Sequence, residues 1–290
     1  MRKPVALSGR CICVGAAVLL VSCGTRVVPH PESAMISVEV SHERAMDTRP
    51  VGAALTFQPK FTPGVMRGTN TVVRLLVDEQ QPLLAVKAKV NGVEGRFAID
   101  TAAPHTVFTP AFLDKAMPSS RTSYPVERVT QGVTQSLECV PVFSLAVGGV
   151  IFTDFDAVIS PETHGADGII GANLLTALPV TIDCPAMLLS FALPSHTAAW
   201  HRIRFVRQSG SVALPVTTGT TESYCVLDPC TPHSCLAAAT ATGGVAIGGT
   251  PIEHNVPFVA GRANVLGFTF FRRYAIALIP GSGTVLFQAR

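Results

Sequence analysis

The sequence is poor in charged residues. Asp, Glu, Lys and Arg make up only 14% of its 290 residues, and the net charge at pH 7 is +3. So small a charge does not provide the basic surface that nucleic-acid binding requires, and we expect no nucleic-acid partner. No apolar run reaches the roughly 18 residues of a membrane-spanning helix, which excludes a multi-pass membrane protein. Hydrophobic residues reach 48%, which excludes wholesale disorder.

Several sequence patterns are absent as well. There is no Gly-x-Ser-x-Gly, no His-Glu-x-x-His and no phosphate-binding loop, so the hydrolase and nucleotide-binding classes that these motifs mark are not indicated. Helical patterns are few, and only 110–117 and 172–177 are expected to form short helices. Glycine (24) and proline (22) are frequent. This composition is typical of a turn-rich β protein.

The first 22 residues have the character of a bacterial export signal. A basic start precedes an apolar stretch from residue 11 to residue 21, which is too short to cross a membrane as a helix. The stretch ends in Leu20-Val21-Ser22-Cys23-Gly24, which resembles a lipobox. The resemblance implies cleavage before Cys23 and a diacylglycerol on its thiol, with Gly24 favouring the outer membrane. The alternative is an ordinary secretory signal with an incidental cysteine.

We therefore expect a lipid-anchored protein of the bacterial cell envelope that faces the periplasm. Residues 23–68 are expected to form a lipidated tether, because they contain several prolines and no sustained period. An envelope protein can form disulfides, and five cysteines follow Cys23, so at least one has no partner within the chain. A disulfide between two of Cys225, Cys230 and Cys235 is one arrangement that the spacing leaves open. The same cysteines match no known zinc motif, so we expect no metal and no cofactor.

The chain repeats itself after residue 98. The first and second copies each place an aspartate, a proline and a histidine in one register, with Asp100 matching Asp228 and His105 matching His233. Ordered, collinear matches indicate an internal duplication. Three blocks recur in the same order: 98–108 with 226–236, 145–149 with 245–249, and 168–171 with 264–267.

The local pattern around these blocks is that of β-strands. Val86, Ala88 and Val90 alternate with lysines, and Asn91-Gly92 then supplies a hairpin turn. Residues 97–99 return as a strand that leads into Asp100. Residues 211–216 and 224–227 have the same pattern before Asp228, and two later glycine pairs are typical of further turns. The sequence therefore predicts an all-β fold.

Two repeats with one aspartate each resemble the pepsin and retropepsin clan of aspartic proteases. The motif of that clan is an apolar pair, then Asp-Thr/Ser-Gly, and later two aliphatic residues and a glycine, as in Ile169-Ile170-Gly171 and Val265-Leu266-Gly267. The resemblance covers residues 70–290. It implies an acid protease fold with lobes at 69–195 and 205–290 and a cleft between them. Asp100 and Asp228 would then form a catalytic dyad that shares one proton and activates water.

The loops depart from the clan's pattern after each aspartate. Thr101 can brace the two loops by hydrogen bonding, but Pro229 has neither hydroxyl nor N–H. Ala102 and Cys230 stand where the clan has a glycine whose N–H holds the catalytic carboxylate; their Cβ atoms are costly if the backbone needs a positive φ. Two functions follow. One is a membrane-anchored aspartic endopeptidase that cleaves peptide or protein substrates, and the other is an inactive, peptide-binding or scaffold lipoprotein.

The first copy is also longer than the second. Asp100 to Gly148 spans 48 residues, whereas Asp228 to Gly248 spans 20. The additional residues include 126–142, an alternating stretch broken at Gly132. By resemblance this is a flap in which Gln131, Gly132 and Val133 close over the substrate, and the alternative is a plain surface hairpin. We expect the protein to be a monomer.

Overall fold

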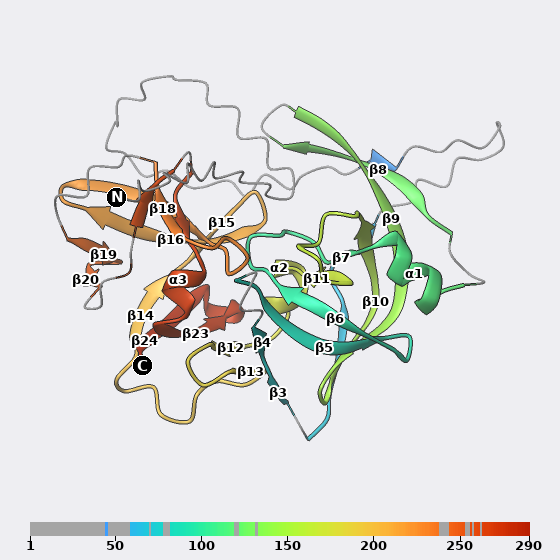
Figure 1. Ribbon diagram of the computed structural model, residues 1–290, viewed down its shortest axis with the longest axis horizontal. Coiled ribbons are helices and arrows are strands. Elements are labelled where there is room, and N and C mark those ends of the chain that lie inside the picture. Colours follow the sequence, from blue (N-terminus) through green and yellow to red (C-terminus); the bar gives the residue numbers. More distant parts are fainter. Residues whose placement is uncertain are drawn as a thin grey trace, which may run out of the picture.

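The computed structural model describes residues 44–45, 59–69, 71–77, 82–118, 122–130, 133–237, 244–252, 256, 258–261 and 263–290. Nearly all regular structure in these residues is β, arranged in three sheets (Figure 1). The α-helices within them are α1 (Pro110–Ala116), α2 (Ala172–Leu175) and α3 (Phe268–Phe271), and none of these is long and apolar enough to cross a membrane. The predicted all-β fold class is confirmed.

The N-terminal sheet has ten strands and holds the first aspartate. Strands β5 and β6 meet at the predicted hairpin turn, where Asn91 and Gly92 have φ angles of 48° and 87°. Two positive φ angles in succession are typical of a two-residue hairpin loop. The strands are β1 (Arg44–Ala45), β2 (Gly64–Arg67), β4 (Leu76–Val77), β5 (Leu84–Val90), β6 (Val93–Ile99), β7 (Val107–Phe108), β8 (Tyr124–Thr130), β9 (Val133–Val147), β10 (Val150–Ile159) and β11 (Gly168–Ile170).

The C-terminal sheet has eight strands and holds the second aspartate. It also contains a hairpin turn with two positive φ angles, at Gly248 and Gly249, where φ is 53° and 81°. The strands are β15 (Val206–Gln208), β16 (Ser211–Thr218), β17 (Thr221–Leu227), β18 (Ser234–Leu236), β19 (Val245–Ile247), β20 (Thr250–Pro251), β21 (Phe258–Ala260) and β22 (Val265–Leu266).

A third, shared sheet joins the two halves of the chain along the lower part of Figure 1. Its centre is an antiparallel pair in which β12 of the first half lies against β23 of the second half. Because this pair is hydrogen-bonded along its length, it holds the N-terminal and C-terminal sheets in one orientation. Its strands are β3 (Val72–Arg74), β12 (Val180–Asp183), β13 (Leu188–Ser190), β14 (His201–Arg204), β23 (Tyr274–Ile279) and β24 (Thr284–Ala289), with a short 3-10 helix η1 (Pro280–Ser282) before β24.

Aromatic side chains fill the core beside both sheets. Phe97 packs edge-on against Phe108 and Phe112, with ring centroids 5.7 and 5.1 Å apart. Phe270 stacks on Tyr274 at 4.7 Å in the second half. Each fully buried aromatic side chain contributes about 1.5–3 kcal/mol, so these clusters fix the strands that lead into the two aspartates.

The predicted tether is wrong at its C-terminal end. Strand β2 pairs with β10, and Phe61 stacks on His105 with a centroid distance of 3.8 Å. The Asn173 side-chain amide also donates to the Phe61 carbonyl at 3.0 Å. The folded first half therefore begins before residue 69. The short apolar segments here have no periodic pattern of their own, and their strand partner lies far away in the sequence. The signal segment and Cys23 lie outside the described residues.

The hairpin predicted over 126–142 is confirmed. Strands β8 and β9 pair antiparallel from Tyr124–Cys139 to Thr130–Val133. Val133 begins β9, and Gln131 and Gly132 lie outside the described residues. In Figure 1 strands β8 and β9 run together through the upper right of the view, toward the second half of the chain.

Candidate active site

Each aspartate lies at the carboxyl end of a strand that pairs parallel with a short aliphatic strand. Asp100 follows β6, and its N–H donates to the Ile170 carbonyl of β11 at 3.1 Å. Asp228 follows β17, and its N–H donates to the Leu266 carbonyl of β22 at 3.0 Å. The aliphatic pairs found in the sequence are therefore the strands that hold the two aspartate loops.

The glycine after each aliphatic pair lets the chain cross closely behind the aspartate loop. A Cβ on Gly171 would lie 2.4 Å from the carbonyl carbon and oxygen of His105, and one on Gly267 would lie 2.3 Å from the His233 carbonyl oxygen. Both distances are too short for any side chain. The two halves therefore build the same crossing with the matched residues, which supports the predicted duplication.

The second aspartate has more hydrogen-bond donors than the first. Asp100 Oδ1 accepts from the Ala102 N–H at 2.7 Å. Asp228 Oδ1 accepts from the N–H groups of Cys230 and Thr231 at 2.9 and 3.0 Å, and its Oδ2 accepts from the Thr231 hydroxyl at 2.6 Å. The first loop has Ala103 where the second has Thr231, so it lacks that hydroxyl. Three donors stabilise the Asp228 carboxylate.

The altered loop residues are tolerated because of their backbone conformation. Neither Ala102 nor Cys230 has a positive φ, so their Cβ atoms cause no backbone strain. Both residues keep the N–H that contacts the carboxylate of their own loop. The cost anticipated from the missing glycines therefore does not arise at either position.

Asp100 is buried and lies close to the second aspartate. Asp100 is only 4% exposed. Burial raises the pKa of Asp100 well above its usual value of 3.8, and the negative charge of Asp228 raises that pKa further. The N–H groups of Ala102 and Ala103 act in the opposite direction. Two carboxylates that interact in this way share protons, and here burial favours the protonated form of Asp100.

Hydrogen bonds from both halves brace the first aspartate loop. The Thr101 hydroxyl donates to the Leu227 carbonyl at 2.5 Å, immediately before Asp228. At the start of β16, the Val212 N–H donates to the Thr101 carbonyl at 3.1 Å, and the Ser211 hydroxyl donates to the Ala102 carbonyl at 2.5 Å. The bracing contact expected of Thr101 is therefore present between the two halves.

His164 is a group that sequence reasoning missed. It lies in the loop between β10 and β11 with a φ of 54°. Among the described residues, Asp100, His164 and Cys230 form a group whose oxygen, nitrogen and sulfur atoms lie within 4.8 Å of one another. The sequence contained a signal for His164. The aliphatic strand β11 pairs with the strand that leads into Asp100, so the loop that precedes β11 lies near this aspartate.

These three side chains are of metal-ligating types. Two of them take part in hydrogen bonds of the aspartate loops: Asp100 accepts from the Ala102 N–H, and the Cys230 thiol donates to the Ile99 carbonyl. Burial raises the pKa of Cys230 well above its usual value, and the charges of Asp100 and Asp228 raise it further.

The disulfide that the spacing left open does not form. Cys184, Cys225 and Cys230 are free thiols, which excludes any pairing of Cys225, Cys230 and Cys235 with one another. Cys225 is buried in β17, where burial raises the pKa of its thiol to about 12. The loop that contains Asp228 is therefore held by hydrogen bonds and packing.

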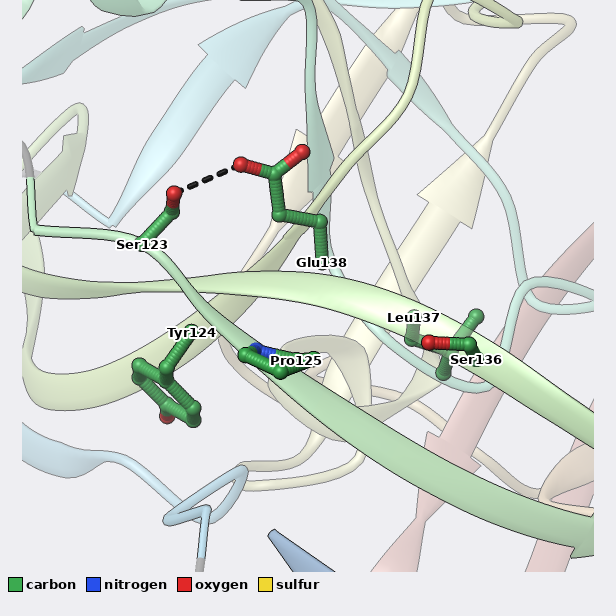
Figure 2. A pocket seen from close by; sticks show the side chains of 6 residues that line it. All are labelled: Ser123, Tyr124, Pro125, Ser136, Leu137 and Glu138. Carbon is green, nitrogen blue, oxygen red and sulfur yellow. Dashed lines mark hydrogen bonds between the residues drawn. The ribbon is translucent and has the colours of Figure 1, made fainter. Parts of the chain in front are cut away.

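A separate hollow of about 360 Å³ lies at the base of the β8–β9 hairpin (Figure 2). The hydroxyl of Ser123 donates to Glu138 there at 2.6 Å, on an exposed surface. The residues that line it include neither aspartate: Ser123, Tyr124, Pro125, Ser136, Leu137 and Glu138. The hollow is therefore not lined by the aspartates, and we place the candidate active site at the two aspartate loops.

Two comparisons with known proteins found similarities. Residues 86–174, which contain Asp100 and Gly171, match a family model described as aspartyl protease. A solved structure of the aspartic proteinase from Irpex lacteus is similar over 76% of this chain and 97% of that chain, with a TM-score of 0.54 and 14% sequence identity. The chain has the fold of a pepsin-like aspartic proteinase. No curated protein matches it in a sequence comparison.

The pepsin-like fold confirms the resemblance that the repeated motifs indicated. The family match ends at residue 174 and does not include the second aspartate loop. In this fold the N-terminal and C-terminal sheets are the two lobes, and the shared sheet joins them. The roles of the individual residues do not follow from the fold alone.

Proposed function

We propose that the protein is an aspartic endopeptidase in which Asp100 and Asp228 act together on a water molecule. The observation that supports this most directly is the different environment of the two carboxyl groups. Asp100 is buried with a raised pKa, whereas Asp228 accepts three hydrogen bonds. Paired carboxyls in unlike environments are suited to opposite roles as acid and base.

We derive the proposed roles within the pair from this asymmetry. Asp228, which accepts the three hydrogen bonds, takes a proton from the water that attacks the peptide carbonyl carbon. Asp100 donates its proton to the carbonyl oxygen, which gives a tetrahedral diol. Collapse of the diol breaks the C–N bond when a proton passes to the amide nitrogen and a diol proton returns to the pair. The proton count of the dyad is restored at the end of the cycle.

The alternative of a purely binding protein rested on the altered second loop. That argument is weakened because Asp228 still accepts a hydrogen bond from the Cys230 N–H and accepts another from the Thr231 hydroxyl. The β8–β9 hairpin supports an extended peptide as the substrate, since a strand-like peptide can pair with such a hairpin. We retain the binding function only as an outcome of the test below.

Peptide cleavage tests the proposal. We expect the full chain with Cys23→Ser, incubated with a diverse peptide mixture from pH 3 to 7, to produce cuts that mass spectrometry detects. Because burial and the Asp228 charge raise the pKa of Asp100, the singly protonated pair and the activity should persist to a higher pH than for an unperturbed carboxyl pair. No cuts at any pH from a folded protein would contradict the proposal and favour the binding function.

We also propose that Cys23 carries a lipid anchor in the cell envelope. When the full chain is made in a bacterial host with labelled palmitate, the native chain should incorporate label and Cys23→Ser should not. Two acyl chains or more are needed for firm anchoring, so the variant should also leave the membrane fraction. Cys13→Ser is the matched control and should keep the label. Label on Cys23→Ser would exclude the lipobox interpretation.

A further inference from the structure

The two aspartate loops exchange hydrogen bonds in both directions. The Thr101 hydroxyl donates to the carbonyl of Leu227, the residue before Asp228. In the opposite direction, the Cys230 thiol donates to the carbonyl of Ile99, the residue before Asp100, with an S···O distance of 3.6 Å. Each donor lies within two residues of its own aspartate, and each acceptor directly precedes the other aspartate.

The second of these bonds comes from an unexpected residue. The clan's pattern would place the donor directly after Asp228, where this chain has Pro229 with neither hydroxyl nor N–H. The thiol one residue later reaches the equivalent acceptor. The N–H of the same cysteine holds the Asp228 carboxylate at 2.9 Å. Cys230 is thus connected to both aspartate loops, one through its backbone and the other through its side chain.

The surroundings of the thiol suit a hydrogen-bond donor. Cys230 is 8% exposed and packs with residues of the first half, among them Leu83, Ala98 and Ile169. Burial, followed by the charges of Asp100 and Asp228, raises the pKa of the thiol well above its usual value, so it keeps its proton. A protonated sulfur in contact with a carbonyl oxygen is a donor.

We propose that Cys230 is a positioning residue whose thiol replaces the missing hydroxyl of the second loop and, through Ile99, fixes Asp100 relative to Asp228. The catalytic consequence rests on the proposed peptidase function. The bond itself does not, because it lies between two loops of the fold. Misplacement of catalytic groups by about 1 Å can cost about 100-fold in rate. Loss of the donor should therefore lower kcat more than it changes KM.

The experiment compares Cys230→Ser, which keeps a donor, with Cys230→Ala, which has none. We expect Cys230→Ala to lower kcat about tenfold or more with KM changed by less than about twofold, and Cys230→Ser to recover most of kcat. Cys225→Ala removes another buried thiol, from β17 of the same lobe, and should leave kcat near that of the native protein. Equal kcat for Ser and Ala at position 230 would overturn the positioning role.

Thermal unfolding provides a readout that does not depend on peptidase activity. If the Ile99 carbonyl accepts a bond from position 230, Cys230→Ser should unfold about 2–4 °C above Cys230→Ala. Without that acceptor, the buried serine hydroxyl has no partner and Cys230→Ser should be the less stable of the two, which would overturn the proposal. A native protein that cleaves nothing would end the peptidase assignment and leave this comparison intact.

A second pair of variants guards against failure of Cys230→Ala to fold. Thr and Val have the same shape, and only Thr can donate. Cys230→Thr should therefore exceed Cys230→Val in both unfolding temperature and kcat. A Val variant that equals or exceeds Thr in both would contradict the proposed bond.

Discussion

Asp100→Asn is expected to reduce peptide cleavage by about 10²–10⁴-fold and, at the same time, to stabilise the fold near neutral pH. The loss of cleavage follows because the amide cannot donate the proton that the carbonyl oxygen needs. The gain in stability follows because Asp100 is buried beside Asp228, where a charge is unfavourable. Active sites often contain groups that lower the free energy of unfolding, and a neutral replacement of such a group raises it.

The sign of the pH dependence follows from proton binding. The pKa of Asp100 is near 3.8 in the unfolded chain and well above that value in the folded protein. Between these two values the folded state binds more protons than the unfolded state. The free energy of unfolding therefore decreases as pH rises through this window, and the decrease stops above the folded pKa. The side-chain amide of the Asp100→Asn variant does not titrate, so the variant lacks this contribution to the decrease.

Thermal unfolding of the native chain and Asp100→Asn from pH 4 to pH 7 measures the effect. The advantage of the variant should grow as pH rises. Asp228→Asn is the matched control, because it removes the other proposed catalytic carboxyl but loses a carboxylate that accepts three hydrogen bonds. It should lose cleavage to a similar degree and unfold at a lower temperature than the native chain. An Asp100→Asn variant that is less stable than the native chain at pH 7 would contradict this account.

Gly171→Ala and Gly267→Ala should each destabilise the fold by more than about 3 kcal/mol. A new Cβ would lie 2.4 Å from backbone atoms of His105 or 2.3 Å from the His233 carbonyl oxygen. Backbone that crosses behind an aspartate loop cannot move without displacing the aspartate. With a total stability of about 5–15 kcal/mol for a typical protein, such a loss leaves little folded population at 37 °C.

Denaturant unfolding and circular dichroism measure this effect. Gly281→Ala is the control, because a Cβ there meets no atom within 4 Å and the residue lies in η1, away from the aspartates. It should stay within about 0.5 kcal/mol of the native chain. Equal stabilities of Gly171→Ala and Gly281→Ala would show that the crossing is looser than the distances indicate.

Much of the fold could be predicted because its signals are local. The Asn91-Gly92 turn, the short helix from Pro110 and the β8–β9 hairpin each depend on neighbouring residues, and all three form as predicted. The Asp segments and the later segments of two aliphatic residues and a glycine also located the aspartate loops, since both copies keep these segments in the same order. The contribution of residues 60–67 was missed because their strand partner in β10 lies more than 80 residues away.

The candidate site illustrates what only the tertiary structure decided. The sequence by itself determined an all-β chain with two aspartate loops, one of which lacks both the usual hydroxyl and the usual glycine. It did not determine that the Cys230 thiol reaches Ile99, or that His164 lies beside Asp100. These contacts join residues 131 and 64 positions apart. Such pairings depend on how two sheets and a shared third sheet are oriented, and no local propensity carries that information.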